Sequence, residues 1–259
     1  MINTHSKDLA PERLDKIAHI LREHHVVRVQ ELCDSMGVSP ATVRRDLTEM
    51  EARGLIRKVH GGAVAVDARL DEPLFDDKTA VHVDEKQRIA HAALDLIGTH
   101  DSIFLDGGST VLALAALLGE MRRLTVVTNS LRVASALSGS KPRVIVIGGE
   151  LRALSETFVG PLTGLMIEKL HVDTAFMGTI GLSLGKGLTT TDPREAYTKQ
   201  RIIESANRVV LMADSSKVNT VSFVGFSPVS GVDTLITDSA ASTRDVQAFR
   251  KANLTVTTV

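Results

Sequence analysis

The sequence predicts an α/β protein in which a small helical N-terminal domain precedes a larger, mostly parallel α/β domain. Three observations support this prediction. Residues 11 to about 60 show helical spacing of apolar side chains, segments after about residue 84 alternate between strand and helix patterns, and an acidic, proline-interrupted stretch separates them. Strands that alternate with helices are typical of parallel sheets covered on both faces. We therefore expect a first domain over residues 1–66, a linker over 67–83 and a second domain over 84–259.

Composition limits the classes of function. The 259 residues are 43% hydrophobic and 24% charged, with a formal net charge of −1, so any binding of nucleic acid must come from a local patch. One cysteine, Cys33, excludes a disulfide framework, and the histidines lack partners at metal-ligand spacing. The polar start has no features of a targeting peptide, and no apolar stretch approaches the roughly 20 residues that span a bilayer. We expect a cytoplasmic protein with no membrane partner.

The first domain is predicted to open with an amphipathic helix, because apolar residues recur at three- and four-residue spacing from Leu14 to Leu21. A short extended piece at residues 27–29 and a second helix over residues 30–36 follow. Gly37 then ends the second helix, because glycine readily adopts the left-handed conformation found at helix ends.

A third helix is predicted to begin with Ser39 as its N-cap. Pro40 takes the first helical position, where its missing N–H costs nothing. Val43, Leu47 and Met50 fall on one stripe and give this helix a face that packs into a core. The other face carries adjacent arginines.

A turn between two short helices, the second with an apolar and a basic face, is the pattern of a helix-turn-helix. Residues 55–66 then read as a two-stranded wing that turns at Gly61 and Gly62. In this motif the start of the second helix contacts base edges, and basic residues contact phosphates. The alternative for the basic residues is an ordinary solvated face. The predicted DNA-binding residues are Ser39, Ala41, Thr42, Arg44, Arg45, Arg57, Lys58 and His60.

The second domain is predicted to begin with a helix over residues 84–97. Buried strands follow in the segments SIFL, LTVVT, RVIVI, DTAFM, RVVLM and DTLIT. Further helices are expected near residues 109–119, 192–206 and 242–252. This order of elements gives a parallel sheet with the loops after its strands gathered along one edge.

The stretch DGGST combines the end of a strand, a glycine-rich turn and the start of a helix, which together favour an anion. Small residues let backbone N–H groups approach a ligand, and Ser109 and Thr110 add hydroxyl groups. It matches neither the Walker loop nor the dinucleotide GxGxxG motif. The alternative is a tight turn in which Ser109 is an N-cap. Residues 128–130 and Gly149, after the next two strands, should line the same sheet edge.

Asp192, Glu195 and Lys199 lie on one face of a predicted helix because of their spacing. Taken alone, this spacing favours a surface ladder of ion pairs; the alternative, if they face an anion-binding turn, is contact with a phosphorylated ligand. Asp214 and Lys217 form a second candidate pair at a strand end, and Gly178 allows close approach of backbone.

The segment VSPATVRRDLTEME and the following IRKVHGGA resemble the DeoR-type winged helix-turn-helix at the N-terminus of bacterial sugar-metabolism repressors. The resemblance continues through EPLF, EKQRIA, IFLDGGST, TVVTNS, GGELR, VGP, GLTTTD and ADSSK, and so covers essentially the whole chain. It implies that the second domain is a phosphosugar-isomerase-like sensor for a phosphorylated metabolite.

The resemblance further implies a transcriptional repressor of carbohydrate-metabolism genes, released from its operator by a phosphorylated sugar, and no enzyme. The expected partners are double-stranded operator DNA, the phosphorylated sugar and further copies of the chain, as a dimer or tetramer. No cofactor, metal or catalytic residue is expected. Two alternatives stay open: a phosphosugar isomerase with a DNA-binding appendage, and a redox or dinucleotide sensor, against which the missing GxGxxG counts. The expected effector-binding residues are Asp106, Gly107, Gly108, Ser109, Thr110, Thr128, Asn129, Ser130, Gly149, Gly178, Asp192, Glu195, Lys199 and Lys217.

Overall fold

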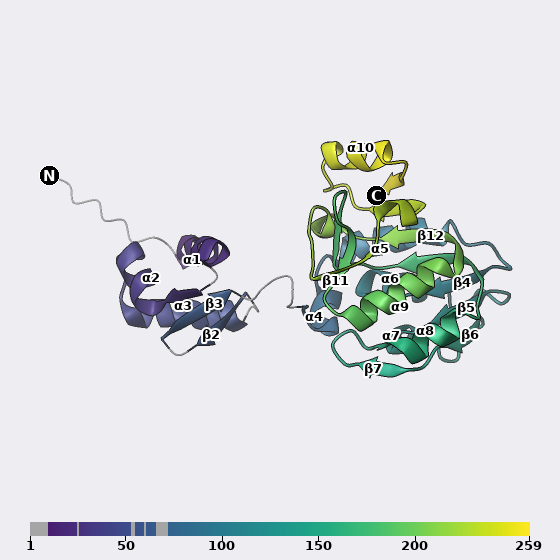
Figure 1. The fold of residues 1–259 in the computed structure, drawn as a ribbon, viewed down its shortest axis with the longest axis horizontal. Helices are drawn as coiled ribbons and strands as arrows, with labels where there is room; N and C mark the ends of the chain where they lie inside the picture. The colour runs from purple at the N-terminus through teal and green to yellow at the C-terminus, as the bar shows by residue number, and fades with distance from the viewer. Residues whose placement is uncertain (1–9, 25, 53–54, 60, 66–71) are drawn as a thin grey trace. The chain divides into compact units, whose positions relative to one another are not determined.

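The computed structural model describes residues 10–24, 26–52, 55–59, 61–65 and 72–259. The chain divides into two compact units, Met1–Asp71 and Glu72–Val259, and each is described by itself (Figure 1). Among the described residues, no helix is long and apolar enough to cross a membrane.

The first unit is a winged helix-turn-helix. Its helices are α1 (Ala10–His24), α2 (Val29–Met36) and α3 (Pro40–Ala52), and its strands are β1 (Val26–Arg28), β2 (Ile56–Val59) and β3 (Gly62–Ala65). The strands form an antiparallel sheet in the order β1-β3-β2, so that β2 and β3 make the expected wing. The helices, the turn and the wing that the sequence predicts are confirmed.

Local signals explain why these helices begin and end where they do. Gly37 has a φ of 65° and donates its backbone N–H to the Cys33 carbonyl at 2.8 Å, which ends α2. The Ser39 hydroxyl accepts the Thr42 backbone N–H at 3.2 Å, so Ser39 caps α3 and Pro40 begins it. Gly54, a residue type that can end α3 by adopting the left-handed conformation, lies outside the described residues. The core consists of Leu14, Ile17, Leu21, Val27, Leu32, Cys33, Val43, Leu47, Met50, Ile56 and Ala63.

The second unit contains a seven-stranded sheet in which every pairing is parallel. Its order is β15-β14-β12-β9-β4-β5-β6. The strands are β4 (Ser102–Leu105), β5 (Thr125–Thr128), β6 (Arg143–Val146), β9 (Val172–Met177), β12 (Ala206–Met212), β14 (Thr234–Thr237) and β15 (Thr255–Thr258). The predicted mostly parallel α/β domain is therefore confirmed.

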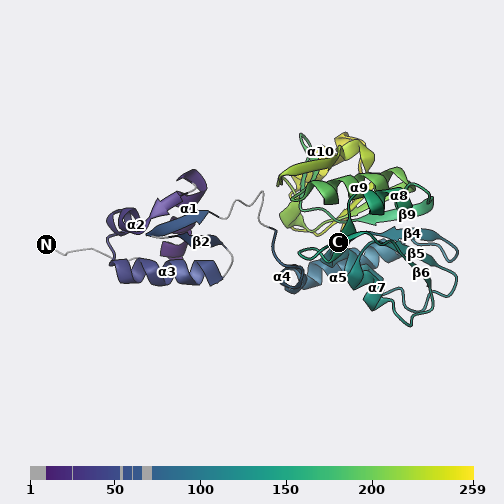
Figure 2. The same ribbon diagram turned by 60° about the horizontal axis from the view of Figure 1, so that its bottom comes forward.

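Helices cover both faces of this sheet (Figure 2). Alternate side chains of β4 show the division, because Phe104 belongs to one buried core and Ile103 and Leu105 to the other. The first core includes residues of α8 (Pro161–Ile167), α9 (Pro193–Glu204) and α10 (Thr243–Lys251); the second includes residues of α5 (Val83–Leu94), α6 (Ser109–Ala115) and α7 (Leu131–Ala136).

Smaller elements surround the sheet edge. A hairpin is formed by β7 (Glu150–Arg152) and β8 (Thr157–Val159), and a second antiparallel sheet has the order β10-β11-β13. Its strands are β10 (Gly181–Ser183), β11 (Gly187–Thr190) and β13 (Val224–Ser227), and short 3₁₀ turns occupy Ser215–Lys217 and Val229–Gly231.

The segment expected to be a linker contains regular structure near its end. Residues Phe75–Ala80 form α4. The sequence lacks sustained periodicity here, but the Phe75 ring is buried and Lys78 forms an ion pair with Glu72 at 2.5 Å. These tertiary contacts hold a helix that its own sequence does not signal.

The order of the strands reverses direction once within the sheet. From β4 the chain proceeds outward through β5 to β6, and then returns to the other side of β4 with β9 and continues through β12 and β14 to β15. The direction of the order thus changes between β4 and β9. In open α/β sheets, ligands bind beyond the carboxyl ends of the strands at such a switch point.

Candidate functional site

The outer face of α3 carries the predicted DNA-reading residues. Arg44, Arg45 and Ala41 are exposed, Thr42 is half-buried, and the side chains of Val43 and Leu47 are buried in the core. A helix that is anchored by one face and presents adjacent arginines on the other has the arrangement that reads a major groove.

A buried ion pair positions α3 against α1, and the sequence analysis did not predict it. The Arg13 guanidinium donates to both carboxylate oxygens of Asp46, from Nε at 2.8 Å and from Nη2 at 3.0 Å. Asp46 is only 3% exposed. Such a two-bond pair fixes orientation as well as distance, so it sets the tilt of the helix that carries the arginines.

The wing is tied to α3 through Lys58. Its backbone N–H donates to Glu51 at 2.8 Å, and its ammonium lies 3.1 Å from the Thr48 hydroxyl and 3.2 Å from Glu51. The hydrogen bonds from Lys58 lower the pKa of the Glu51 carboxyl. Arg57 lies on β2 opposite Val64, and the predicted contact residue His60 lies outside the described residues.

In the second unit, the glycine-rich turn lies between β4 and α6 at the switch point. Gly108 has a φ of 138°, which favours glycine, and a Cβ on Gly107 would meet the Thr157 methyl group at 2.1 Å. Gly108, and not Ser109, occupies the N-cap position, and α6 ends at Ala115 instead of near residue 119.

Asp106 and Lys199 form a buried ion pair beside this turn. The Lys199 ammonium contacts the Asp106 carboxylate and donates to the Gly178 carbonyl at 3.1 Å, while Asp106 accepts the Gly178 N–H at 3.1 Å. Lys199 is 3% exposed and Asp106 2% exposed. The expected proximity of Lys199, Gly178 and the turn is therefore present, with Lys199 already paired inside the protein.

Asp192 and Glu195 contact a second cation, Arg152. Asp192 is the N-cap of α9 and accepts the backbone N–H groups of Arg194 and Glu195 at 2.8 and 3.2 Å, so it lies just before the helix that was expected to include it. Arg152 Nε lies 3.4 Å from Asp192, and Arg152 Nη1 lies 3.4 Å from Glu195. Glu195 in turn lies 3.7 Å from Lys199.

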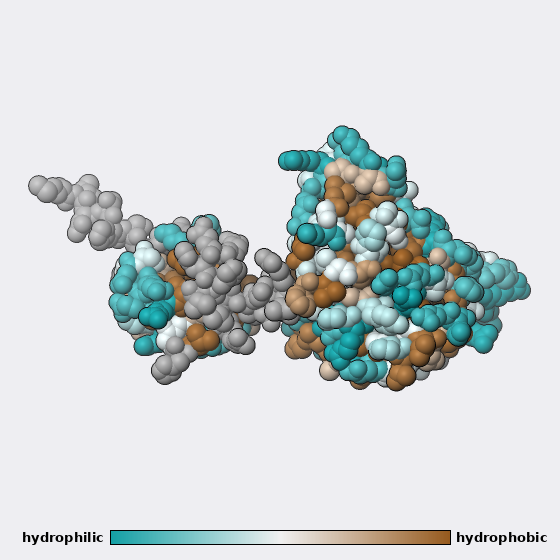
Figure 3. All heavy atoms as spheres, in the orientation of Figure 1, coloured by the Kyte–Doolittle hydropathy of each residue, from teal (hydrophilic) through white to brown (hydrophobic). Residues whose placement is uncertain are grey.

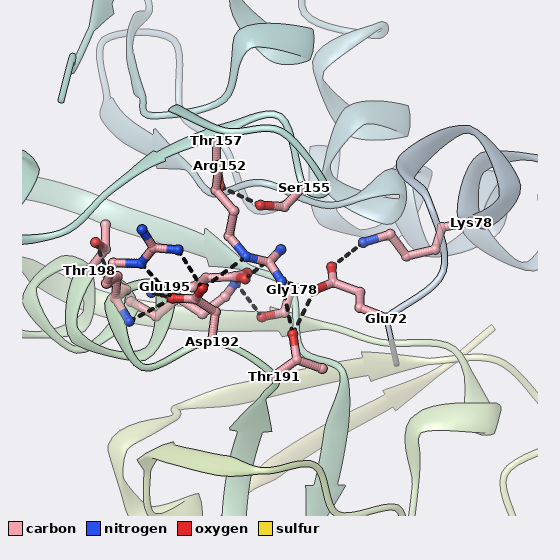
Figure 4. A network of polar contacts seen from close by, with 12 residues as sticks. Glu72, Lys78, Arg152, Ser155, Thr157, Gly178, Thr191, Asp192, Glu195 and Thr198 are labelled. Carbon is pink, nitrogen blue, oxygen red and sulfur yellow. Dashed lines mark hydrogen bonds and ion pairs between the residues drawn. The ribbon is translucent and has the colours of Figure 1, made fainter. Parts of the chain in front are cut away.

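Arg152 extends this network to Glu72, which the sequence analysis did not predict. Arg152 Nη2 lies 2.9 Å from Glu72, the Thr191 hydroxyl donates to Glu72 at 2.7 Å, and Lys78 contacts the other Glu72 oxygen at 2.5 Å. Figure 4 displays these side chains converging from segments far apart in the chain. The Glu72 side chain is 1% exposed and that of Arg152 10% exposed.

The network shifts the pKa values of its buried side chains. Burial raises the pKa of the Glu195 carboxyl, and the nearby cations only partly oppose this. Burial alone would lower the pKa of the Lys199 ammonium, but the carboxylates of Asp106 and Glu195 outweigh it and raise that pKa. For Glu72, the cations Lys78 and Arg152 overcome the effect of burial and lower the pKa.

Two buried atoms of the network lack hydrogen bonds. They are Nη1 of Arg152 and Oε2 of Glu195, the atoms that lie 3.4 Å apart in this ion pair. Buried polar groups are almost always hydrogen-bonded. Arg152 and Glu195 therefore form an ion pair at this contact without the hydrogen bond that such a pair usually includes.

The other predicted edge residues play mixed roles. The Thr128 hydroxyl donates to the Leu105 carbonyl at 2.7 Å, and Ser130 caps α7 by accepting the Val133 N–H at 3.3 Å. Asn129 donates to the Phe158 carbonyl at 2.9 Å while its buried Oδ1 has no partner in the structure. Gly149 adopts a φ of 149°, where a Cβ would meet the Thr163 hydroxyl at 2.0 Å.

Lys217 belongs to a neighbouring group of charges. It ends the 3₁₀ turn that Asp214 caps by accepting the Ser216 N–H at 3.1 Å. Lys86, which the sequence analysis missed, is buried nearby and donates to the Val81 carbonyl at 2.5 Å. Burial lowers the pKa of Lys86, with Asp214 opposing and Lys217 adding to the shift. Within the part of the chain that the structure describes, no ion pair joins Lys217 to Arg152.

A cavity of about 390 Å³ lies away from the glycine-rich turn, between the β10–β11 turn and β13. Lys186, Gln200 and Phe226 are among its lining residues. No buried ion pair is found among these lining residues, in contrast to the switch point. Phe226 lies between the cavity and the switch point, because it lines the cavity and its ring centre is 5.5 Å from the Lys199 ammonium.

Two family models match the chain. The DeoR-like helix-turn-helix domain matches residues 13–69, and the DeoR C terminal sensor domain matches residues 81–239. One match lies within each unit.

Curated proteins match over nearly the full length. The HTH-type transcriptional regulator GlpR of Haloferax volcanii is 35% identical over 248 residues, covering 96% of this chain and 97% of that protein. The HTH-type transcriptional regulator GolR of Listeria innocua is 35% identical over 95% of this chain and 97% of its own length. The lactose phosphotransferase system repressor of Streptococcus mutans is 35% identical over 88% of this chain and 91% of its own.

Among solved structures, ribose 5-phosphate isomerase A of Methanocaldococcus jannaschii aligns with a TM-score of 0.40 and 18% identity. The alignment covers 52% of this chain and 54% of that one. A likeness at this level carries no conclusion about chemistry.

Proposed function

The chain belongs to the DeoR family of transcriptional regulators, and from that membership we propose that it represses carbohydrate-metabolism genes and leaves its operator when a phosphorylated sugar binds. The relatives named as repressors, including the lactose phosphotransferase system repressor, support the repressing role. The observation that carries the proposal is the exposed Arg44–Arg45 pair on a helix whose other face closes the core of the first unit.

The DNA contacts divide by their position. Arg44 and Arg45, with Ser39, Ala41 and Thr42 at the start of α3, are proposed to contact base edges and flanking phosphates. Lys58 on the wing, together with Arg57 and His60, is proposed to contact phosphates. Base contacts carry the sequence preference, and phosphate contacts carry the dependence on salt.

The effector site is proposed to lie at the switch point between β4 and β9. Its turn supplies backbone N–H groups and the hydroxyls of Ser109 and Thr110, and Lys199 supplies a buried cation beside it. The carboxylates of Asp192 and Glu195 and the Arg152 guanidinium suit the hydroxyl groups of a sugar. Asn129 offers a buried oxygen that has no partner in the structure. The remaining residues proposed for this site are Asp106, Gly107, Gly108, Thr128, Ser130, Gly149, Gly178 and Lys217.

Binding rather than catalysis is the proposed role of the Glu195–Lys199 pair. The relatives are named as regulators, which supports this role. Incubation with aldose and ketose phosphates tests it, and turnover by the purified protein would favour an isomerase instead.

Self-association is proposed to occur through the second unit, as a dimer or tetramer. Apolar side chains are exposed on the face drawn in Figure 3, and α8 has Leu162, Leu165 and Met166 exposed. A helix that is apolar on all sides is normally covered. Two linked copies of α3, one from each chain, would also contact two half-sites about 34 Å apart, which specific binding usually requires. Light scattering at micromolar concentration measures this, and a strict monomer that binds operator tightly would contradict it.

The decisive experiment for the effector is a thermal-shift screen of the full-length protein. The panel comprises glucose 6-phosphate, fructose 6-phosphate, fructose 1-phosphate, ribose 5-phosphate and glycerol 3-phosphate, each paired with its unphosphorylated parent. A ligand that binds the native state raises its stability by mass action, by about 2.7 kcal/mol at one hundred times its Kd. We expect one phosphate to raise the melting temperature and to release a DNA duplex selected by the protein from a random library.

A further inference from the structure

We infer that Arg152 pairs alternatively with Glu72, the first residue of the second unit, or with Glu195, and that a bound effector favours the pairing with Glu195. The residues Asp106, Lys199, Glu195, Arg152 and Glu72 contact one another in this order, and we call them the ion chain. This inference rests on the proposed function, because it takes the effector to be an anion and the DNA-binding form to be the one that the effector disfavours.

One end of the ion chain is the start of the second unit. Glu72 is its first residue and follows the unit that contains the reading helix. Three contacts hold the buried Glu72 carboxylate: Lys78 at 2.5 Å, Thr191 at 2.7 Å and Arg152 at 2.9 Å. Breaking the contact with Arg152 therefore loosens the point at which the sensor begins.

In the middle of the ion chain, Arg152 and Glu195 are close enough for an ion pair but do not form a hydrogen bond. Arg152 Nη1 and Glu195 Oε2 lie 3.4 Å apart, and neither atom has a hydrogen bond. Arg152 makes its shorter contact with Glu72 instead. A small displacement of the guanidinium toward Glu195 would complete one pair and lengthen the other.

The other end of the ion chain lies at the effector site. Lys199 is shared between Asp106, the Gly178 carbonyl at 3.1 Å and Glu195 at 3.7 Å. An anion bound at the switch point draws the ammonium toward itself. Glu195 then keeps Arg152 as its remaining cation, and a buried carboxylate without a cation is strongly disfavoured. Arg152 consequently moves to Glu195 and away from Glu72.

Linkage assigns the two pairings to functional states. A ligand shifts an equilibrium only through its different affinities for the two forms. The effector prefers the Arg152–Glu195 pairing, so in a repressor released by its effector the operator prefers the Arg152–Glu72 pairing. In this scheme Glu72 stabilises the form that binds the operator, and Glu195 stabilises the form that binds the effector.

Two isosteric variants test this with opposite expected signs. Glu72→Gln weakens the pairing of the DNA-binding form, so the operator Kd should rise about fivefold or more and the Kd for the effector should fall by a similar factor. Glu195→Gln weakens the other pairing, so the Kd for the effector should rise about fivefold or more while the operator Kd does not rise. A residue that only stabilises the fold would not give opposite signs.

The measurements use the full-length protein and the duplex that the parent selects from a random library. Fluorescence anisotropy gives the operator Kd without added ligand. Calorimetry gives the Kd for inorganic phosphate and for the panel sugar phosphate with the largest thermal shift. Glu204→Gln is the matched control, because Glu204 is also on α9 and pairs with Arg201 at 2.8 Å, outside the ion chain. It should change neither Kd.

If Glu72→Gln does not fold, as judged by circular dichroism, Thr191→Val replaces it. This variant keeps the shape of the side chain and removes the hydroxyl that contacts both Glu72 and Arg152. It should change both Kd values in the same directions as Glu72→Gln, by smaller factors.

The outcomes separate the two claims. If the parent binds no phosphate compound, the effector part of the proposed function fails and the ion-chain switch fails with it. If the parent binds a sugar phosphate and releases DNA, but Glu72→Gln or its substitute behaves like Glu204→Gln, only the switch is overturned. It is also overturned if the Glu72 and Glu195 variants shift both affinities in the same direction.

Discussion

In the first unit the arginines proposed to contact DNA are exposed on α3, whereas in the second unit Lys199 and Glu195 are buried and paired within the protein. Exposed charges contribute little to stability and are available to an external partner. Buried charges depend on one another, because each has been removed from water. Substitutions should therefore separate into two classes: those that alter binding alone and those that also alter stability.

The largest effect is expected for Asp106→Asn in the buried network. It leaves the Lys199 ammonium, 3% exposed, without its closest anion. Removing one partner of a buried ion pair costs about 3–5 kcal/mol. Chemical denaturation of the full-length protein measures this, and the double variant Asp106→Leu with Lys199→Met should recover much of the loss. If Asp106→Asn is as stable as the parent, buried charges of the second unit do not depend on one another more than exposed charges of the first unit do.

Asp46 is an exception within the first unit, because it is buried and paired with Arg13. Asp46→Asn should therefore behave like a sensor variant and destabilise the first unit by about 1.5–3 kcal/mol, the worth of hydrogen bonds to charged groups. Thermal unfolding measures this loss. Asp34→Asn, the same change at an exposed position of α2, is the control and should have little effect. Equal stability of the two variants would contradict the bracing role of Asp46.

Arg44→Ala and Arg45→Ala should alter binding without altering stability. Each should weaken operator binding by about 1–3 kcal/mol if its contact is to a base. Their unfolding should stay within about 0.5 kcal/mol of the parent, as for most surface substitutions. Gel-shift titration and thermal melting give the two numbers, with the exposed Arg122 of the second unit replaced as the control. Parent-like affinity of both variants would remove these arginines from the reading face.

Asp192→Ala should cost about 1 kcal/mol, because Asp192 caps α9. Although burial opposes it, bonding to Arg194 and to backbone N–H groups lowers the pKa of Asp192 from 3.8 to about 2. A lowered folded-state pKa gives stability that is present above about pH 4 and is lost as the pH falls toward 2. The stability gap between parent and variant should therefore narrow below pH 4 in melting experiments. If the difference in stability between the parent and Asp192→Ala does not change with pH, the charged Asp192 carboxylate is not its cause.

The smallest effect is expected on the wing. Lys58→Met should weaken binding to all duplexes alike and flatten the salt dependence by about one unit of slope. Because Lys58 also pairs with Glu51 at 3.2 Å, Glu51→Gln should free the ammonium and strengthen binding slightly. Titrations at several salt concentrations measure both effects. A change confined to one DNA sequence would mean that the wing reads bases.

The first unit was largely predictable because its signals are local. Ser39, Pro40 and Gly37 act on backbone within a few residues, and the spacing of Val43, Leu47 and Met50 is read directly from the sequence. The Arg13–Asp46 pair was not predictable in this way, because its partners lie 33 positions apart.

The sensor was predictable only in part, for the same reason. Strand and helix patterns gave the parallel sheet, and the position of DGGST after a strand gave the turn at its edge. Nothing in periodicity links Asp106 to Lys199, which are 93 positions apart, or Thr191 to Glu72, which are 119 apart. Arg152 lies three positions after Gly149, the second glycine of the pair at the sheet edge, and that position was the available signal for it.

The adjacency of β4 and β9 has a consequence for the order in which the protein acquires its parts. The two strands are joined by contacts such as Ser102 to Asp173, across 71 positions, whereas β2 and β3 of the first unit are consecutive. Chains dominated by such distant pairings fold more slowly than those with local ones. Asp106 meets Gly178 only when β4 and β9 pair, so the proposed effector site forms at the same late step as the centre of the sheet. Since domains fold from the N-terminus during synthesis, a newly made chain acquires its helix-turn-helix before it acquires the proposed effector site.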